Sequence, residues 1–109
     1  MVKALTDQTF ERATAHGVTL TDFWAEWCGP CRMQSPVIED LDRDLAGKVA
    51  ISKVDVDHNA ATAAKFDIMS IPTLLIKKDG RVVEKLVGLR TKHQLKAVLA
   101  KYTTLEETN

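Results

Sequence analysis

Cysteine is scarce in this sequence: the chain has only two among its 109 residues, at positions 28 and 31. A small secreted domain held together by disulfides needs more cysteines, spaced widely along the chain. A closed zinc site needs four ligands, and the sequence offers no second cysteine pair and no paired histidines to complete one. A lone, closely spaced cysteine pair therefore indicates redox chemistry, and no metal is expected.

The sequence also lacks an excess of charge of either sign and any long apolar run. Its 15 basic and 15 acidic side chains cancel, so no long-range attraction draws it to nucleic acid or to an anionic membrane. No stretch has the apolar length of a signal peptide or of a membrane span. We therefore expect a cytoplasmic protein that binds neither nucleic acid nor membrane.

What the chain does have is an ordinary globular composition, with 45% apolar and 28% charged residues. A chain of this length forms one domain and buries roughly two-thirds of the surface that its unfolded form exposes. We expect a single monomeric domain over residues 1–109, with the polar segment 103–109 as a frayed tail.

Strand-like and helix-like segments alternate along most of the chain. The expected strands are 2–5, 18–25, 49–55, 73–76 and 82–87, and the expected helices are about 7–15, 30–46, 60–66 and 92–102. The dipeptide Asp79-Gly80 predicts a tight hairpin between the last two strands. Thr6 or Asp7 is expected to cap the first helix and Asn59 the third, and Thr91 with Gln94 fits a capping box for the last.

This order implies an α/β fold with parallel strand pairs, right-handed crossovers and an antiparallel edge added by the hairpin. We expect a central mixed sheet of about five strands with about four helices on its two faces. Strand 18–25 should lie centrally, and its C-terminal end should carry the cysteines, where open α/β sheets place their sites.

The segment Trp27-Cys28-Gly29-Pro30-Cys31 joins that strand to the following helix. Cys28 lies just before the helix, where free N–H groups and the positive end of the helix dipole stabilise a thiolate, which is the attacking species. Cys31 falls one turn inside the helix, close enough to close a small ring with Cys28. Gly29 and Pro30 fix the turn between them, since proline suits a first helical turn.

Asp22 shares a strand face with apolar residues, which is an unusual place for a carboxylate, and Lys53 does the same on the next strand. Two opposite charges on neighbouring apolar faces suggest a semi-buried pair. Burial raises the pKa of such a carboxyl while Lys53 lowers it, which leaves a base able to accept the proton of Cys31. A purely structural ion pair is the alternative.

The stretch from Asp22 to Cys31, Asp-Phe-Trp-Ala-Glu-Trp-Cys-Gly-Pro-Cys, resembles the active-site signature of the thioredoxin family. The resemblance covers about residues 2–102 and leaves only the tail outside. It implies the thioredoxin fold and the reduction of disulfides in other proteins. The further matches, in the family's order, are Pro36, Lys53, Ile71-Pro72-Thr73, Asp79-Gly80 and Val87-Gly88.

The resemblance also implies roles for single residues. Cys28 is the nucleophile, Cys31 resolves the mixed disulfide to leave Cys28–Cys31 oxidised, and Asp22 accepts the proton of Cys31. Gly29, Pro30 and Lys53 tune the redox chemistry. The family's proline at the position of Pro72 is cis and faces the cysteines. The expected substrate-binding residues are Trp27, Ile71, Pro72 and Gly88.

The resemblance further implies that no cofactor is bound and that NADPH supplies electrons through a separate flavin-dependent enzyme, thioredoxin reductase. The other expected partners are proteins that contain disulfides. A disulfide oxidase or isomerase on the same fold is one alternative, although Gly29-Pro30 between the cysteines favours the reductant. A binding module that no longer needs its thiols is another, and the intact pair Cys28 and Cys31 argues against it as the sole role.

Overall fold

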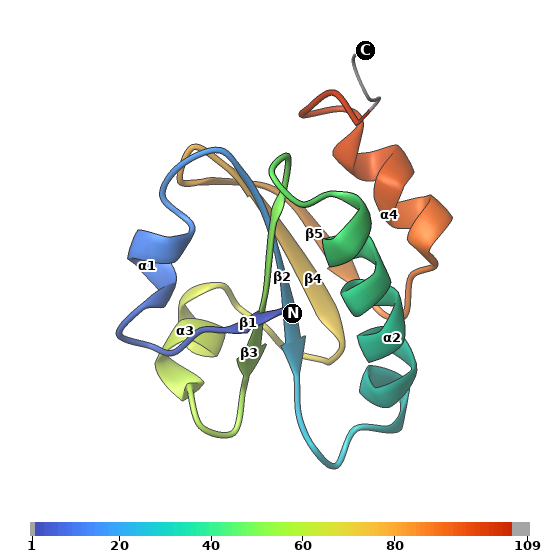
Figure 1. Ribbon diagram of the computed structural model, residues 1–109. Coiled ribbons are helices and arrows are strands. Elements are labelled where there is room, and N and C mark those ends of the chain that lie inside the picture. The colour runs from blue at the N-terminus through green and yellow to red at the C-terminus, as the bar shows by residue number, and fades with distance from the viewer. Residues whose placement is uncertain (1, 106–109) are drawn as a thin grey trace.

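The computed structural model describes residues 2–105, which form a five-stranded mixed sheet with helices on both faces (Figure 1). This confirms the predicted fold class and the predicted order of elements. From residue 106 onward, the tail expected to fray lies outside the described residues. The strands are β1 (Lys3–Ala4), β2 (Val18–Trp24), β3 (Ala50–Asp55), β4 (Thr73–Lys78) and β5 (Arg81–Val87). The helices are α1 (Phe10–Ala13), α2 (Gly29–Asp44), α3 (Ala60–Lys65) and α4 (Lys92–Leu99).

The strand order is β1-β3-β2-β4-β5, so β2 lies in the middle of the sheet as predicted. It runs parallel to β3 and antiparallel to β4, and β1 runs parallel to β3. In the β2–β3 register, Asp22 lies directly beside Lys53. The central strand therefore delivers the cysteine segment at the end of the sheet where β3 also finishes.

The direction of β4 differs from the expected parallel arrangement of strands that alternate with helices. The first five residues of β4 are buried on both faces of the sheet, so the residues of the strand fit either direction. The chain pairs it antiparallel to β2, and β4 starts with Thr73 beside Phe23. As a result, the Ile71–Pro72 peptide lies at the same end of the sheet as the cysteines.

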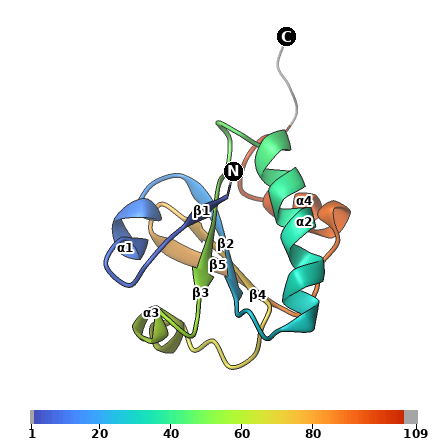
Figure 2. The same ribbon diagram turned by 60° about the horizontal axis from the view of Figure 1, so that its bottom comes forward.

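Helices α2 and α4 cover one face of the sheet, and α1 and α3 cover the other (Figure 2). Each face has its own apolar core, and a third small cluster forms where β2 meets α2. The first core includes Leu20, Ile38, Leu41, Leu74, Leu95 and Leu99. The second includes Phe10, Phe23, Val54 and Leu75. The third consists of Ala25, Cys28 and Cys31, with Trp24, Val56 and Ile71 packed against it.

The predicted cap of the first helix is wrong, because neither Thr6 nor Asp7 is its N-cap residue. Asn59 is the N-cap residue of α3 as predicted, but its side chain makes no capping hydrogen bond and forms a long-range contact instead. Asp7 does not cap α1, whose N-cap residue is Thr9 without a side-chain hydrogen bond. Its carboxylate accepts hydrogen bonds from the backbone N–H (2.8 Å) and the hydroxyl (2.6 Å) of Thr62, in the first turn of α3. The Asn59 side-chain oxygen in turn accepts the N–H of Asp7 at 3.0 Å. This exchange fastens α3 to the segment before α1.

The capping box of α4 is confirmed. The Thr91 hydroxyl accepts the N–H of Gln94 at 3.1 Å, and the Gln94 side-chain oxygen accepts the N–H of Thr91 at 2.9 Å. Across residues 2–105, none of the helices has both the length and the apolar character that a membrane crossing requires.

Lys77 of β4 is a buried lysine that sequence reasoning did not identify, with 2% of its surface exposed. Its ammonium lies 5.0 Å from the ring centre of Phe10 and 5.5 Å from that of Phe66. It donates to the Thr14 hydroxyl at 2.8 Å and lies 3.6 Å from the Glu11 carboxylate. The side chain therefore ties the sheet to the α1 segment through both its apolar stem and its charge.

We expect Lys77→Met to change the free energy of unfolding by less than about 1 kcal/mol, because an apolar side chain of similar volume commonly replaces a buried charge without loss. Lys77→Ala should cost about 3 kcal/mol, since it also leaves a cavity. Urea unfolding at pH 7 measures both values. Equal losses in the two variants would show that the ammonium, and not the stem, stabilises this contact.

Candidate redox site

The two cysteines lie where β2 ends and α2 begins. Cys28 is the N-cap residue of α2, with extended backbone angles of φ −90° and ψ 110°, and its sulfur accepts the N–H of Cys31 at 3.2 Å. Pro30 occupies the first turn. Gly29 opens the helix, and apart from its chain neighbours and the backbone of α2 no described atom lies within 4 Å of the place where a Cβ would stand. The two cysteines are joined by a disulfide, with their Cα atoms 5.3 Å apart.

This position gives the two sulfurs different surroundings. A sulfur anion on Cys28 would sit at the helix N-terminus, within reach of an N–H that already points at it. Cys31 is inside the helix and lines a cavity behind the disulfide. The arrangement suits a first attack by the thiolate of Cys28 and a second attack by the thiol of Cys31.

The cis Ile71–Pro72 peptide lies against the disulfide. The Cys28 sulfur is 3.8 Å from the carbonyl oxygen of Ile71, and the carbonyl of Pro72 accepts the N–H of Gly88 at 2.8 Å. Gly88 has φ +99°, a conformation in which any other residue would be strained. The fold thus gathers Cys28, Ile71, Pro72 and Gly88, which lie far apart in the sequence, at one end of the sheet.

An apolar groove of about 410 Å³ lies on one side of this cluster. Trp27 forms one wall, is 67% exposed, and donates its indole N–H to the Asp57 carboxylate at 2.8 Å. Sequence reasoning identified Trp27 and Ile71 but missed the other lining residues, because no motif marks them and only the fold brings them together. The full lining is Trp27, Val56, Ile68, Met69, Ser70 and Ile71.

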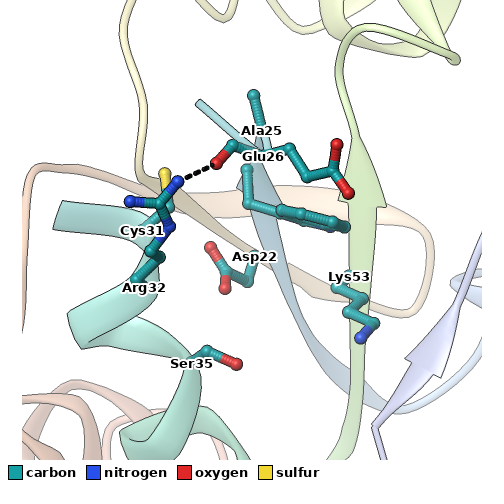
Figure 3. Close-up of a pocket in the computed structure, with 8 residues that line it drawn as sticks. Asp22, Ala25, Glu26, Cys31, Arg32, Ser35 and Lys53 are labelled. Atoms are coloured by element: carbon teal, nitrogen blue, oxygen red, sulfur yellow. Dashed lines mark hydrogen bonds between the residues drawn. The ribbon is translucent and has the colours of Figure 1, made fainter. Parts of the chain in front are cut away.

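Asp22 lies behind the disulfide, in a cavity of about 240 Å³ (Figure 3). Figure 3 shows its carboxyl between Cys31 on α2 and Lys53 on β3. Only 3% of Asp22 is exposed, and its Oδ1 atom has no hydrogen-bond partner within the described part of the chain. Burial raises the pKa of Asp22 from 3.8 to about 7, and the positive charge of Lys53 offsets part of that effect. At neutral pH this carboxyl can therefore both take up and release a proton.

The expected semi-buried pair of Asp22 and Lys53 is correct in position but wrong in contact. The two residues are neighbours in register, yet no ion pair joins them among residues 2–105. The Lys53 ammonium instead lies 5.7 Å from the ring centre of Trp24, a cation–π geometry. Lys53 therefore acts on Asp22 as a charge at a distance, and the carboxyl oxygen stays free to accept a proton.

Comparison with known proteins places the chain in one family. The family model for thioredoxin matches residues 1–101. A thioredoxin of Listeria monocytogenes is 55% identical over 102 residues, which cover 94% of this chain and 99% of that protein. The thioredoxin of Bacillus subtilis is 53% identical over 102 residues, covering 94% and 97%. One from Staphylococcus aureus is 52% identical over 98 residues, covering 90% and 94%.

These matches agree with the structure, since the sheet, the cysteine pair at a helix N-terminus and the cis-proline beside it occur together on one chain. They also confirm the resemblance stated from the sequence and the redox activity that it implied. The chain belongs to the thioredoxin family and is a thiol–disulfide oxidoreductase, reducing disulfides in other proteins by dithiol/disulfide exchange.

Proposed function

We propose that electrons pass through the cysteine pair in two steps. The Cys28 thiolate attacks one sulfur of a substrate disulfide, which forms a mixed disulfide and releases the other substrate sulfur as a thiolate. The Cys31 thiolate then attacks the Cys28 sulfur, which forms Cys28–Cys31 and releases the second substrate thiolate. The substrate disulfide gains two electrons and the cysteine pair loses two.

The observation that carries this assignment is the position of the Cys28 sulfur, which accepts the N–H of Cys31 at the N-terminus of α2. A helix N-terminus stabilises a negative charge by about 0.3–2 kcal/mol. The same N–H that bonds the sulfur in the disulfide supports the thiolate once the disulfide is reduced. Among residues 2–105 the Cys31 sulfur has no such donor at a helix end, so it acts second.

Asp22 supplies the proton acceptor for the second step. Cys31 must lose a proton before it attacks, and Cys31 and Asp22 line the same cavity. With a pKa raised to about 7 by burial, Asp22 is matched to proton transfer at neutral pH. Lys53 keeps that pKa from rising further, which is its tuning role, while Gly29 and Pro30 hold the turn between the cysteines.

Protein substrates bind across the groove beside the disulfide. Trp27 and Ile71 offer apolar contact there, and an extended substrate segment can pair with the backbone before Pro72 as an added strand. Gly88 leaves room for the substrate at the opposite edge of the binding site, because a side chain at that position would block the approach of the substrate.

A separate flavin-dependent enzyme, thioredoxin reductase, returns electrons from NADPH to the oxidised pair. This chain acts as a monomer and docks the reductase at the end of the sheet that carries Cys28. The cytoplasm, which maintains a supply of NADPH and a reducing poise, is the compartment in which such a reductant works.

Reduction of insulin by dithiothreitol tests the proposal. The unaltered chain is expected to accelerate insulin precipitation many-fold over dithiothreitol alone, because Cys28 attacks insulin disulfides faster than the small thiol does. Cys28→Ser should return the rate to that of dithiothreitol alone. Circular dichroism of the variant serves as the folding control. Activity retained by a folded Cys28→Ser chain would contradict the assignment.

A further inference from the structure

Gln34 is a fully buried amide, with 0% of its surface exposed. Its Nε2 donates to the carbonyl of Arg90 at 2.9 Å, and its Oε1 accepts the N–H of Arg90 at 2.8 Å. One side chain thus binds both backbone groups of a residue 56 positions away. Buried polar groups are normally paired, but a two-point contact from a helix to the middle of a loop also fixes that loop in place.

The two ends of this contact lie beside the redox site. Gln34 follows Cys31 by three positions on α2, about one helical turn. Arg90 lies in the loop between β5 and α4, two residues after Gly88. The contact therefore connects the helix that carries the cysteines with the loop that carries one edge of the substrate site.

Other contacts hold the ends of this loop but leave its middle to Gln34. At the first end, the N–H of Gly88 donates to Pro72 at 2.8 Å. At the second end, the capping box of Thr91 starts α4. The Arg90 guanidinium donates to the carbonyl of Val87 at 2.9 Å, a contact within the loop region itself. Lys92, the first residue of α4, also binds α2 through Asp40 at 2.9 Å and through Asp44. Of these contacts, only the one from Gln34 joins α2 to the backbone of the loop itself.

We propose that Gln34 is a positioning residue for protein substrates. It holds the loop of residues 88–91 against α2, so that Gly88 keeps a fixed place beside the cis-proline and the disulfide. The inference rests on the proposed role of Pro72 and Gly88 in substrate binding. Both side-chain hydrogen bonds of Gln34 go to Arg90 and neither cysteine is a partner, so Gln34 acts through the backbone of Arg90.

The substitution Gln34→Met keeps the length of the side chain and removes both hydrogen bonds. The loop then spends part of its time away from the binding position, and the apparent affinity for a protein substrate falls by the fraction of time lost. A loop in place for a fifth of the time raises KM about fivefold. The cysteines and Asp22 are unchanged, so kcat and the reaction with a small aromatic disulfide should stay within about twofold.

The test compares two substrates of the same chain. Steady-state reduction of insulin gives kcat and KM, and single-turnover reaction of the reduced chain with 5,5′-dithiobis(2-nitrobenzoate) measures the thiols without a docking surface. Hydrogen exchange of the Arg90 amide reports on the loop directly. We expect Gln34→Met to raise the insulin KM about fivefold, to accelerate Arg90 exchange and to leave the small-disulfide rate unchanged. Gln34→Asn, which keeps an amide but shortens its reach, should act in the same direction and replaces the Met variant if that chain does not fold.

A matched control is Tyr102→Phe, which removes a hydroxyl that contacts Glu84 and the carbonyl of Val83. This residue lies beyond α4, away from the cysteine end, and its variant should leave all three measurements unchanged. An unchanged insulin KM in folded Gln34 variants would overturn the proposal. A parallel fall in the insulin and small-disulfide reactions would also overturn it, because Gln34 would then support the cysteine helix itself. A wrong assignment of Cys28 would be detected separately, because the insulin assay of Cys28→Ser is carried out with Gln34 unchanged.

Discussion

Replacing Cys31 by serine is expected to stop turnover and to leave the chain bonded to its substrate. Cys28 remains at the helix N-terminus with the backbone N–H of residue 31 as its donor, so the first attack proceeds. Resolution then needs a thiol from another molecule instead of the neighbouring sulfur. Well-oriented intramolecular groups reach effective concentrations of about 10⁵ M or more, so without added thiol we expect the mixed disulfide to persist at least about a thousandfold longer.

Mass spectrometry of the chain after mixing with a disulfide-bonded peptide measures this effect. The substrate is two peptides joined by one disulfide. The Cys31→Ser chain should gain the mass of one of these peptides as fast as the native chain makes its first attack, and dithiothreitol should remove the adduct. Cys28→Ser is the matched control and should form no such adduct in the same time. An adduct on that control, or one that decays as fast as in the native chain, would show that the two cysteines have been assigned in the wrong order.

The second large effect is expected from Asp22→Asn, which should slow resolution of the mixed disulfide about 100-fold, a typical loss for a general base. The amide keeps the size of the side chain but cannot accept the proton of Cys31. The first attack should be unchanged, because Cys28 lies outside the Asp22 cavity. Stopped-flow kinetics of the two steps separates them. The native resolution rate should also increase through pH 7, where Asp22 ionises, and the variant should lack this dependence. If resolution keeps its native rate, Asp22 is only a structural group.

The same substitution is expected to stabilise the oxidised protein at alkaline pH. The Asp22 carboxyl holds its proton more tightly in the folded chain, where its pKa is raised from 3.8 to about 7, than in the unfolded chain. The favourable contribution is therefore complete below pH 3.8 and is lost as the pH rises to about 7. Over the interval from pH 3.8 to about 7, this contribution to the free energy of unfolding amounts to about 4 kcal/mol, at about 1.4 kcal/mol per pH unit.

Urea unfolding of both chains at pH 5 and pH 8 checks the sign. Asp22→Asn should be more stable than the native chain at pH 8, and the difference between their free energies of unfolding should be smaller at pH 5. Asp40→Asn is the surface control. Hydrogen bonding to Lys92 lowers the pKa of Asp40, so removing this carboxylate should not stabilise the folded protein at either pH. A variant at position 22 that is no more stable at pH 8 would show that burial does not hold the carboxyl in its protonated form.

Local signals in the sequence predicted local structure well. The Thr91 and Gln94 capping box and the Asp79-Gly80 turn both depend on residues within a few positions of each other, and both are present. Asp7 has the right side chain for a local cap, but a distant N–H on α3 binds it instead. The predicted direction of β4 is wrong for a similar reason: the strand is buried on both faces, and its direction depends on its pairing with β2, which no local pattern marks.

The redox site shows the same division. The cysteine segment and the two-residue period that places Asp22 on an apolar face are visible in the sequence alone. The cis state of Pro72 was expected only through the family resemblance, since most bonds before proline are trans. Gln34 had no signal, because a lone glutamine on a helix gives no indication of a backbone partner 56 residues away.

The redox site and the Asp79–Gly80 turn lie at opposite ends of the sheet. Cys28, Pro72 and Gly88 gather where β2 and β3 finish, whereas the Asp79–Gly80 turn lies at the other end of β4, where the N–H of Gly17 bonds to the Asp79 carboxylate. A fluorophore, a surface tether or a bead attached at that turn would therefore point away from incoming disulfides (Figure 1). The chain can be immobilised there as a solid-phase reductant without obstructing electron transfer.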